Sequence, residues 1–277
     1  SHHFANRRGA MLSFHGVGGS VGDVAGPLIT GVLLLVMGWR GILSIYAVGP
    51  ILMALIAVWV FKGIGGGKEE NANTAGLTER LAMTKNLVKS PLLRGLTIVR
   101  GLRSMALAAI VTLLALYLGN DLDLGVLNRG FHISLLIAVG LLAKPIAGTA
   151  SDKLGRKQVL VPGLVWSCAI TLLMVAFDDG VSLTVTIVLL GMFLYPDQPI
   201  LTAALFDVLD REEATIGLGV VSFASFLMAA VSPLIAGAIY EISGFQAGLY
   251  YVSALFALAA LALAVLPLTK AAGEEQI

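Results

Sequence analysis

The sequence predicts an all-α membrane protein built from two similar halves, and two observations indicate this: its composition and an internal repeat. Apolar residues make up 57% of the 277 residues and charged residues 13%, whereas soluble domains contain about 25% charged residues. Apolar stretches of about 20 residues recur along the chain, and each is long enough to cross a bilayer core of about 30 Å as a helix. A soluble fold of this length could not bury so much apolar surface.

The internal repeat has an offset of 206 residues. The segment GPLITG at 26–31 reappears as SPLIAG at 232–237. The GWR that follows at 38–40 reappears as GFQ at 244–246, with the same offset. Both copies lie in long apolar stretches and run in the same direction, which is typical of a transporter built from two parallel halves.

The offset also predicts a longer protein. The second half begins near Leu96, and its counterpart in the first half would fall about 110 residues before Ser1. We therefore expect about four further helices ahead of Ser1. These N-terminal helices of the same protein would be direct partners of the helices present here.

The apolar stretches predict eight membrane-spanning helices. They cover residues 11–37, 41–61, 96–118, 131–150, 158–177, 181–206, 215–240 and 246–267.

The distribution of Lys and Arg predicts the orientation of these helices. If the N-terminus is cytoplasmic, thirteen of the eighteen lie on the cytoplasmic side: Arg7, Arg8, Lys62, Lys68, Arg80, Lys85, Lys89, Arg94, Lys153, Arg156, Lys157, Arg211 and Lys270. The opposite side holds only Arg40 and Arg129, and the remaining three lie within spans. Because cytoplasmic loops carry an excess of Lys and Arg, both ends of the chain are expected in the cytoplasm.

Residues 62–95 form the one long connection and are expected to be a cytoplasmic linker. Three glycines at 65–67 and a charged KEE at 68–70 are typical of a flexible segment. Residues 1–61 would then be the last two helices of an N-terminal bundle, and residues 96–277 a complete C-terminal six-helix bundle. Within the linker, Leu77, Leu81 and Val88 could line one face of a short interfacial helix.

The first span carries a stripe of small residues and an acid. Gly18, Gly22 and Gly26 follow at intervals of four and leave one helix face bare, so that another helix can approach closely; plain helix packing explains such a stripe equally well. Pro27 removes a backbone donor and bends the helix. Asp23 lies about 18 Å into the helix, where an ionisable group is costly and marks a functional site.

The counterpart of Asp23 in the repeat is Ala229, so the fold itself does not require a carboxylate at this position.

Other function classes fit the sequence poorly. The letters GGSVG at 18–22 match the nucleophile elbow of serine hydrolases, but that elbow needs a strand before it and His132 is the only candidate base for Ser20. No Lys-Ser or Lys-Thr follows the glycines, so no phosphate-binding loop is present. We expect no enzyme activity, cofactor or metal. The net charge of +1 favours no nucleic-acid partner, and the single Cys168 excludes an intrachain disulfide.

The loop between the fourth and fifth spans contains a motif that resembles the signature of a known family. The segment GTASDKLGRK at 148–157 contains an acid, a glycine for the chain reversal and two cations. It resembles the loop signature of the major facilitator superfamily, G-x-x-x-D-x-x-G-R-K/R, which occurs there between helices 2 and 3 and between helices 8 and 9. The matching residues are Gly148, Asp152, Gly155, Arg156 and Lys157.

The first span also resembles this family. Gly22, Gly26, Pro27 and Gly31 match the fifth-helix motif G-x-x-x-G-P-x-x-G-G, which is associated with antiporters, while Thr30 replaces the first glycine of its closing pair. The resemblance covers essentially the whole chain and implies a major facilitator fold, with the eight spans as helices 5 to 12. Family helices 5 and 8 meet between the two halves, which makes Lys144 a candidate partner for Asp23.

Four further charges are expected within the second half. Arg100 and Arg103 share one helix face and could instead extend to the cytoplasmic surface, as could Lys144. Asp197 lies about 24 Å into its helix, between Pro196 and Pro199. The family resemblance implies that the helices of Arg103 and Asp197 face the central cavity, and we expect an arginine to contact Asp197 there.

The sequence thus predicts a drug/proton antiporter-like transporter in a bacterial inner membrane. It would export a small organic molecule against inward proton movement by alternating access. Uptake of an organic anion, with Arg100 and Arg103 supplying the charge, is the alternative. An intramembrane hydrolase is a more distant alternative. The variant Ser20→Ala would separate the two classes, because it would abolish hydrolysis but spare transport.

Overall fold

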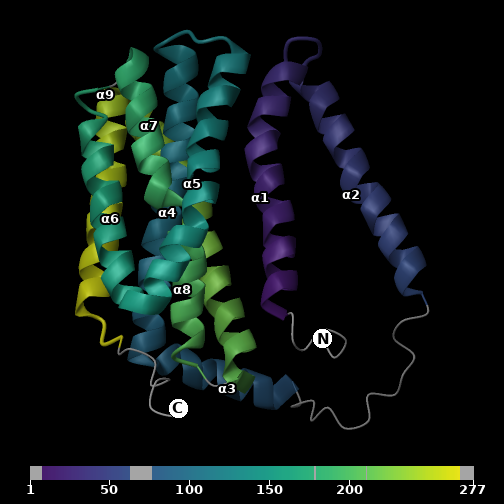
Figure 1. Cartoon of the computed structure of the whole chain (residues 1–277), viewed down its shortest axis with the longest axis vertical. Helices are drawn as coiled ribbons and strands as arrows, with labels where there is room; N and C mark the ends of the chain where they lie inside the picture. The colour runs from purple at the N-terminus through teal and green to yellow at the C-terminus, as the bar shows by residue number, and fades with distance from the viewer. Residues whose placement is uncertain (1–7, 63–76, 178, 210, 269–277) are drawn as a thin grey trace.

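The computed structural model describes residues 8–62, 77–177, 179–209 and 211–268, and it is helical throughout these ranges apart from short connections (Figure 1). The helices are α1 (Arg8–Leu33), α2 (Trp39–Phe61), α3 (Leu77–Lys89), α4 (Pro91–Asn120), α5 (Val126–Leu154), α6 (Arg156–Leu173), α7 (Gly180–Leu194), α8 (Asp197–Phe206) and α9 (Arg211–Val265). All eight expected spans are helical, and the expected all-α membrane fold is confirmed.

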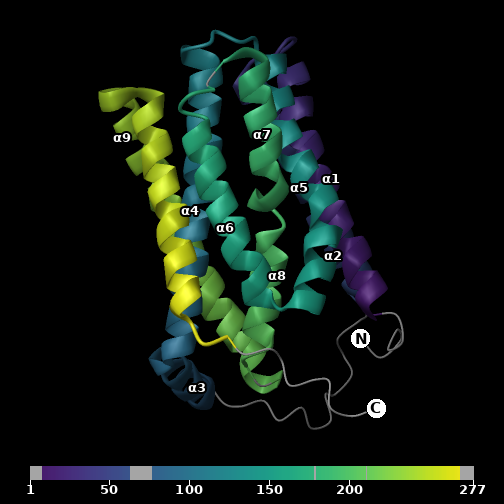
Figure 2. The same ribbon diagram turned by 60° about the vertical axis from the view of Figure 1, so that its left-hand side comes forward.

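Two of the expected spans differ in detail from what the apolar pattern predicts. The span 181–206 is interrupted at residues 195–196, so it forms α7 and α8. The last two spans form one element, α9, which is broken at Gly244 by a backbone with φ 79° and ψ −179°. We call residues 211–243 the first arm of α9 and residues 245–265 its second arm; Figure 2 shows the bend between them.

The bend at Gly244 gives the sequence repeat a structural meaning. Pro27 lies inside α1, and Gly38 precedes α2. Pro233 lies inside the first arm of α9, and Gly244 precedes the second arm. The two copies of the repeated motif are therefore two helical hairpins with the same order of proline and glycine.

Five helical stretches in the described part are long and apolar enough to cross a membrane: Trp39–Phe61, Pro91–Asn120, Val126–Leu154, Gly180–Phe206 and Glu213–Val265. The apolar side chains of α2 are almost all exposed: only 6% of its most apolar 18-residue stretch is buried. An apolar helix with an exposed surface is stable in lipid rather than in water. The chain is therefore an integral membrane protein.

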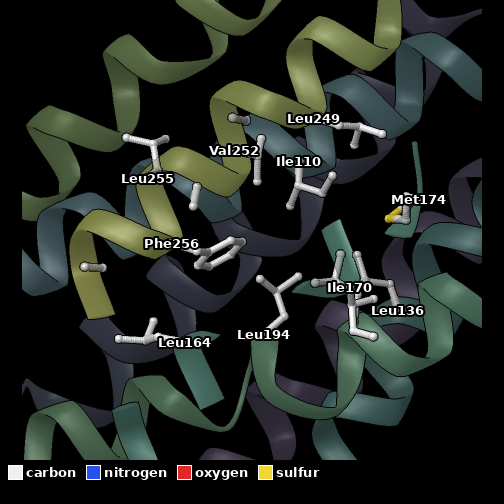
Figure 3. Packing of buried hydrophobic residues seen from close by; sticks show 14 of the residues in the cluster. Ile110, Leu136, Leu164, Ile170, Met174, Leu194, Leu249, Val252, Leu255 and Phe256 are labelled. Carbon is white, nitrogen blue, oxygen red and sulfur yellow. The ribbon is translucent and has the colours of Figure 1, made fainter. Parts of the chain in front are cut away.

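The core lies among α4, α5, α6, α7 and the second arm of α9. Figure 3 shows the side chains of these helices gathered around Phe256, which is fully buried. α4 is central, since it packs against both α9 and the short helix α3. Its start is fixed by Pro91 and by the Ser90 hydroxyl, which accepts a hydrogen bond from the Leu93 amide over 3.5 Å.

The linker contains a helix, α3, which packs against the end of α4. Leu87 is 5% exposed and joins a small cluster there, whereas Val88 is 46% exposed. The side chains of Leu77 and Leu81 lie outside the described residues, so the expected interfacial face of Leu77, Leu81 and Val88 stays a prediction.

α1 packs against α5, and the two backbones touch where glycines face carbonyl groups. A Cβ atom on Gly31 would lie 2.9 Å from the Val126 carbonyl oxygen, and one on Gly130 would lie 2.5 Å from the Pro27 carbonyl oxygen. Only glycine fits at such distances. We call these four residues the α1–α5 seam.

The seam lies at one end of the glycine stripe rather than along it. A Cβ atom on Gly22 or Gly26 would have no neighbour within 4 Å, so the expected close approach at these two positions is not found in the described residues. The surroundings of Gly18 lie outside the part whose side chains are described.

Candidate functional site

An ion pair between Arg103 of α4 and Asp197 of α8 lies at the centre of the candidate site. The Arg103 Nε donates to Asp197 Oδ2 over 2.7 Å, and Arg103 Nη2 lies 2.5 Å from Oδ1. The second pair is an ionic contact only, because its geometry does not align a hydrogen bond to Oδ1. The two residues are 3% and 5% exposed, so the ion pair is buried inside the protein.

The break between α7 and α8 positions Asp197. Pro196 and Pro199 lack the amide hydrogens that would bond the carbonyl groups of Met192 and Tyr195 in a continuous helix, so a break is favoured here. At the end of α7, the Leu194 carbonyl oxygen accepts a hydrogen bond from Arg103 Nη2. Asp197 then lies in the first turn of α8, where the partial positive charge of a helix N-terminus favours a carboxylate.

Arg100 lies one turn before Arg103 and is 9% exposed. Neither arginine extends to the cytoplasmic surface, so that alternative is wrong for both. They line a small cavity with a volume of about 20 Å³, together with Ser104, Gln198, Leu201, Ser222, Ser225 and Phe226. Arg100 and Arg103 thus converge with Asp197, as expected, although their role in transport stays a prediction.

Tyr195 lies within electrostatic range of both this ion pair and α1. It occupies the α7–α8 break, and the charges of Arg103 and of Asp23 act on its hydroxyl group. Asp23 is exposed in the described part of the chain, whereas Lys144 of α5 is half-buried. The expected pairing of Asp23 with Lys144 stays a prediction.

A second charged cluster lies at the turn between α5 and α6. The Arg156 Nε donates to Asp207 Oδ2 over 3.0 Å, and Arg156 Nη1 donates to Asp152 and, over 2.7 Å, to the Ser151 hydroxyl. Burial alone would lower the pKa of the Arg156 guanidinium, but the hydrogen bonds and charges of Asp207 and Asp152 outweigh it and raise that pKa. Arg156 therefore stays charged and holds α8 to this turn.

The other residues of the loop motif shape this turn. Gly155 has φ 108°, a backbone conformation that favours glycine, and it separates α5 from α6. Lys157 donates to the Leu266 carbonyl over 2.8 Å and so ties the start of α6 to the end of α9. The Asp152 side chain is 66% exposed, and the side chains at the start of α1 lie outside the described residues.

The hydrolase alternative lacks its structural requirement. The segment 18–22 lies inside α1, so no strand precedes Ser20 and no elbow forms. The His132 ring contacts the Asn128 carbonyl over 2.8 Å and the Thr184 hydroxyl over 3.2 Å. Both ring nitrogens are therefore engaged within α5 and α7.

Several residues near the ion pair were missed by sequence reasoning. Ser222 and Ser225 lie three positions apart in an apolar helix, a spacing that places them on one face and could have indicated a polar stripe. Tyr195 carries no such signal, because a tyrosine in a transmembrane stretch is usually a packing or interface residue.

Comparison with known proteins gives two further findings. A family model described as Major Facilitator Superfamily matches residues 1–143 and, separately, residues 96–277. The chain is also 21% identical over 241 residues to a Bacillus subtilis (strain 168) protein named "Uncharacterized MFS-type transporter YfnC". The match covers 86% of this chain but only 58% of that relative's length.

Proposed function

The chain belongs to the major facilitator superfamily, and from this premise we propose that the protein is a secondary active transporter that moves a small organic molecule by alternating access. The observation that carries the proposal furthest is the buried ion pair of Arg103 and Asp197 at a broken helix. Irregular backbone and ionisable groups are tolerated at this depth where they line a transport pathway or are buried in protein.

We propose further that transport is coupled to protons. Protonation of Asp197 would remove its attraction for Arg103, so the ion pair can be broken and remade during a transport cycle. Tyr195 lies under the influence of both this pair and Asp23. Asp23 would carry the proton between the two halves, and its protonation would change the electrostatic potential at the ion pair.

Export is the direction we propose, against inward proton movement. The supporting feature is the resemblance of Gly22, Gly26, Pro27 and Gly31 to the antiporter-associated helix motif. The excess of Lys and Arg on one side supports a cytoplasmic position for both ends of the chain, and we propose a bacterial inner membrane as its location.

Uptake of an organic anion together with protons is the second candidate. The observation that favours it is Arg100 Nη1, which is buried and has no hydrogen-bond partner among the described residues. Antiport and symport move protons in opposite directions relative to substrate, so a single assay separates them.

The test uses full-length protein in liposomes that contain a pH-sensitive dye. A panel of organic cations and anions is added outside, and the substrate-induced pH change inside is recorded. Antiport predicts that inward substrate movement makes the interior more alkaline, and symport predicts the opposite. Asp197→Asn should abolish the response, while the matched Asp207→Asn should retain at least half of it. Equal responses from the two variants would refute the assignment of Asp197.

A further inference from the structure

We propose that the cavity beside Arg100 binds one compact anionic group, either a halide ion or the carboxylate end of a transported molecule. The second form rests on the transport function proposed above, whereas anion binding itself does not. The cavity lies between α4, α8 and the first arm of α9. Its volume of about 20 Å³ exceeds the roughly 10–15 Å³ that one water molecule needs, so it accommodates a single small group.

The cavity is lined by hydrogen-bond donors that lack partners. Arg100 is 9% exposed, and its Nη1 is buried with no hydrogen-bond partner in the described part of the chain. The half-buried hydroxyls of Ser104 and Ser222 also make no hydrogen bond to any described residue. Ser225 differs, because it donates to the Val221 carbonyl over 2.6 Å. One guanidinium nitrogen and two hydroxyl groups are thus free to donate to a ligand.

The charges around the cavity favour an anion. Two arginines and one carboxylate leave a net charge of one positive unit, and Arg103 already engages both oxygens of Asp197. Among the described residues, the charges that act on Arg100 are those of Arg103 and Asp197. The other nearby acid, Asp23, acts on Tyr195 instead.

Arg100 therefore has no carboxylate of its own. Leaving a charge buried without a counterion is costly, and a bound anion would offset that cost. A guanidinium with neighbouring hydroxyl donors matches the chemistry of a carboxylate or halide, since charge-assisted hydrogen bonds to such groups are the strongest.

The test measures anion binding directly. Full-length protein in detergent is titrated with sodium chloride or sodium acetate while its melting temperature is followed by tryptophan fluorescence. Ionic strength is held constant with the sodium salt of 2-(N-morpholino)ethanesulfonate, whose tetrahedral sulfonate group is larger than a carboxylate or a halide ion. We expect a saturable rise in melting temperature whose midpoint concentration increases at least tenfold in Arg100→Gln and two- to fivefold in Ser222→Ala.

Arg129→Gln is the matched control. Arg129 also has a buried nitrogen without a partner among the described residues, but it lies near the start of α5, away from the cavity. This variant should keep the wild-type midpoint. If Arg100→Gln does not fold, the Ser222→Ala titration and a bromide anomalous peak beside Arg100 Nη1 in crystals give the answer.

The outcomes separate the two ligand sources and the two proposals. Chloride binding without acetate binding identifies a halide site, and competition between them identifies a carboxylate site. Wild-type and Arg100→Gln protein responding alike, or the bulky sulfonate acting as well as chloride, would overturn the inference. Proton-coupled transport measured on the same preparations shows whether the transport proposal survives independently.

Discussion

Arg103 and Arg156 are both held by carboxylates, yet the two ion pairs differ in what they contribute. Arg103 and Asp197 are 3% and 5% exposed, whereas the side chains of Arg156 and Asp207 are 24% and 30% exposed. Removing one partner of a buried pair leaves an uncompensated charge and costs about 3–5 kcal/mol. A pair near the surface contributes only about 0–1 kcal/mol, because water screens it.

This contrast gives the first prediction. Asp197→Ala should lower the melting temperature in detergent far more than Asp207→Ala, since only the first variant leaves a buried arginine without a counterion. We expect a destabilisation of about 3–5 kcal/mol against about 1 kcal/mol or less. The double variant Arg103→Met with Asp197→Leu should recover much of the loss. Equal melting temperatures for the two single variants would show that the pair is not electrostatically isolated from water.

Depth and chemistry made Asp197 and an arginine partner predictable from the sequence, but not which arginine makes the contact. An acid flanked by two prolines inside an apolar stretch has few explanations other than a buried site. The choice of Arg103 rather than Arg100 as its partner depends on the rotation of α4 relative to α8. Side-chain spacing within one helix does not fix that rotation, because it is set by packing between helices.

Helix α5 carries two glycines with opposite surroundings, and they supply the second prediction. Gly130 belongs to the α1–α5 seam, whereas a Cβ atom on Gly148 would have no neighbour within 4 Å. Gly130→Ala should therefore force the helices apart and cost about 1–3 kcal/mol. Gly148→Ala should be neutral or stabilise the protein by up to about 1 kcal/mol, because alanine favours a helix. Thermal unfolding of both variants checks this prediction. A Gly130→Ala protein as stable as the wild type would show that α1 and α5 are not in close backbone contact at the seam.

The turn between α5 and α6 supplies the third prediction. Asp152 and Asp207 both bind Arg156, so the motif links this turn to α8 in the state described here. Asp152→Asn should weaken that link and slow transport several-fold, while substrate affinity measured on the outward-open state changes less than about twofold. Transport rates in liposomes and equilibrium binding to protein locked outward-open are the two measurements. Lost affinity with normal turnover would place Asp152 in the binding site instead.

Helix positions followed from the apolar pattern, but helix breaks did not all follow. The break at Gly244 was anticipated as a connection, because polar and small residues separate two apolar stretches there. The break at 195–196 was not, since the stretch 181–206 is apolar on both sides. A proline inside a span permits either a kink or a full interruption, and the outcome depends on which groups donate hydrogen bonds to the carbonyl groups at the break. Here Arg103 of α4 donates to the Leu194 carbonyl oxygen.

The fourth prediction concerns communication between α1 and the ion pair of α4 and α8. Asp23 on α1 acts on Tyr195, which is also influenced by Arg103 of α4. Asp23→Asn should reduce proton-driven transport at least tenfold and leave counterflow of substrate without a proton gradient largely intact. The matched control is Asp123→Asn, in the exposed loop between α4 and α5. Unchanged gradient-driven transport in Asp23→Asn would remove this residue from the proton pathway.

The fifth prediction concerns how the chain crosses the membrane. In Figure 1 the loop between α4 and α5 lies at the opposite end of the bundle from the turn between α5 and α6. In a Cys168→Ser background, a membrane-impermeant thiol reagent added to intact cells should label Asp123→Cys but not Lys153→Cys. Permeabilised cells should label both. The reverse pattern would invert the proposed orientation.

The α1–α5 seam has a consequence for how the α1–α2 hairpin can move past α5. Its closest approaches join a glycine to a backbone carbonyl group, at Gly31 with Val126 and at Gly130 with Pro27. No side chain at these points has to leave a pocket or change rotamer before the helices shift. We therefore expect α1 and α5 to move by shear, that is, by a small sliding of one packed helix along the other.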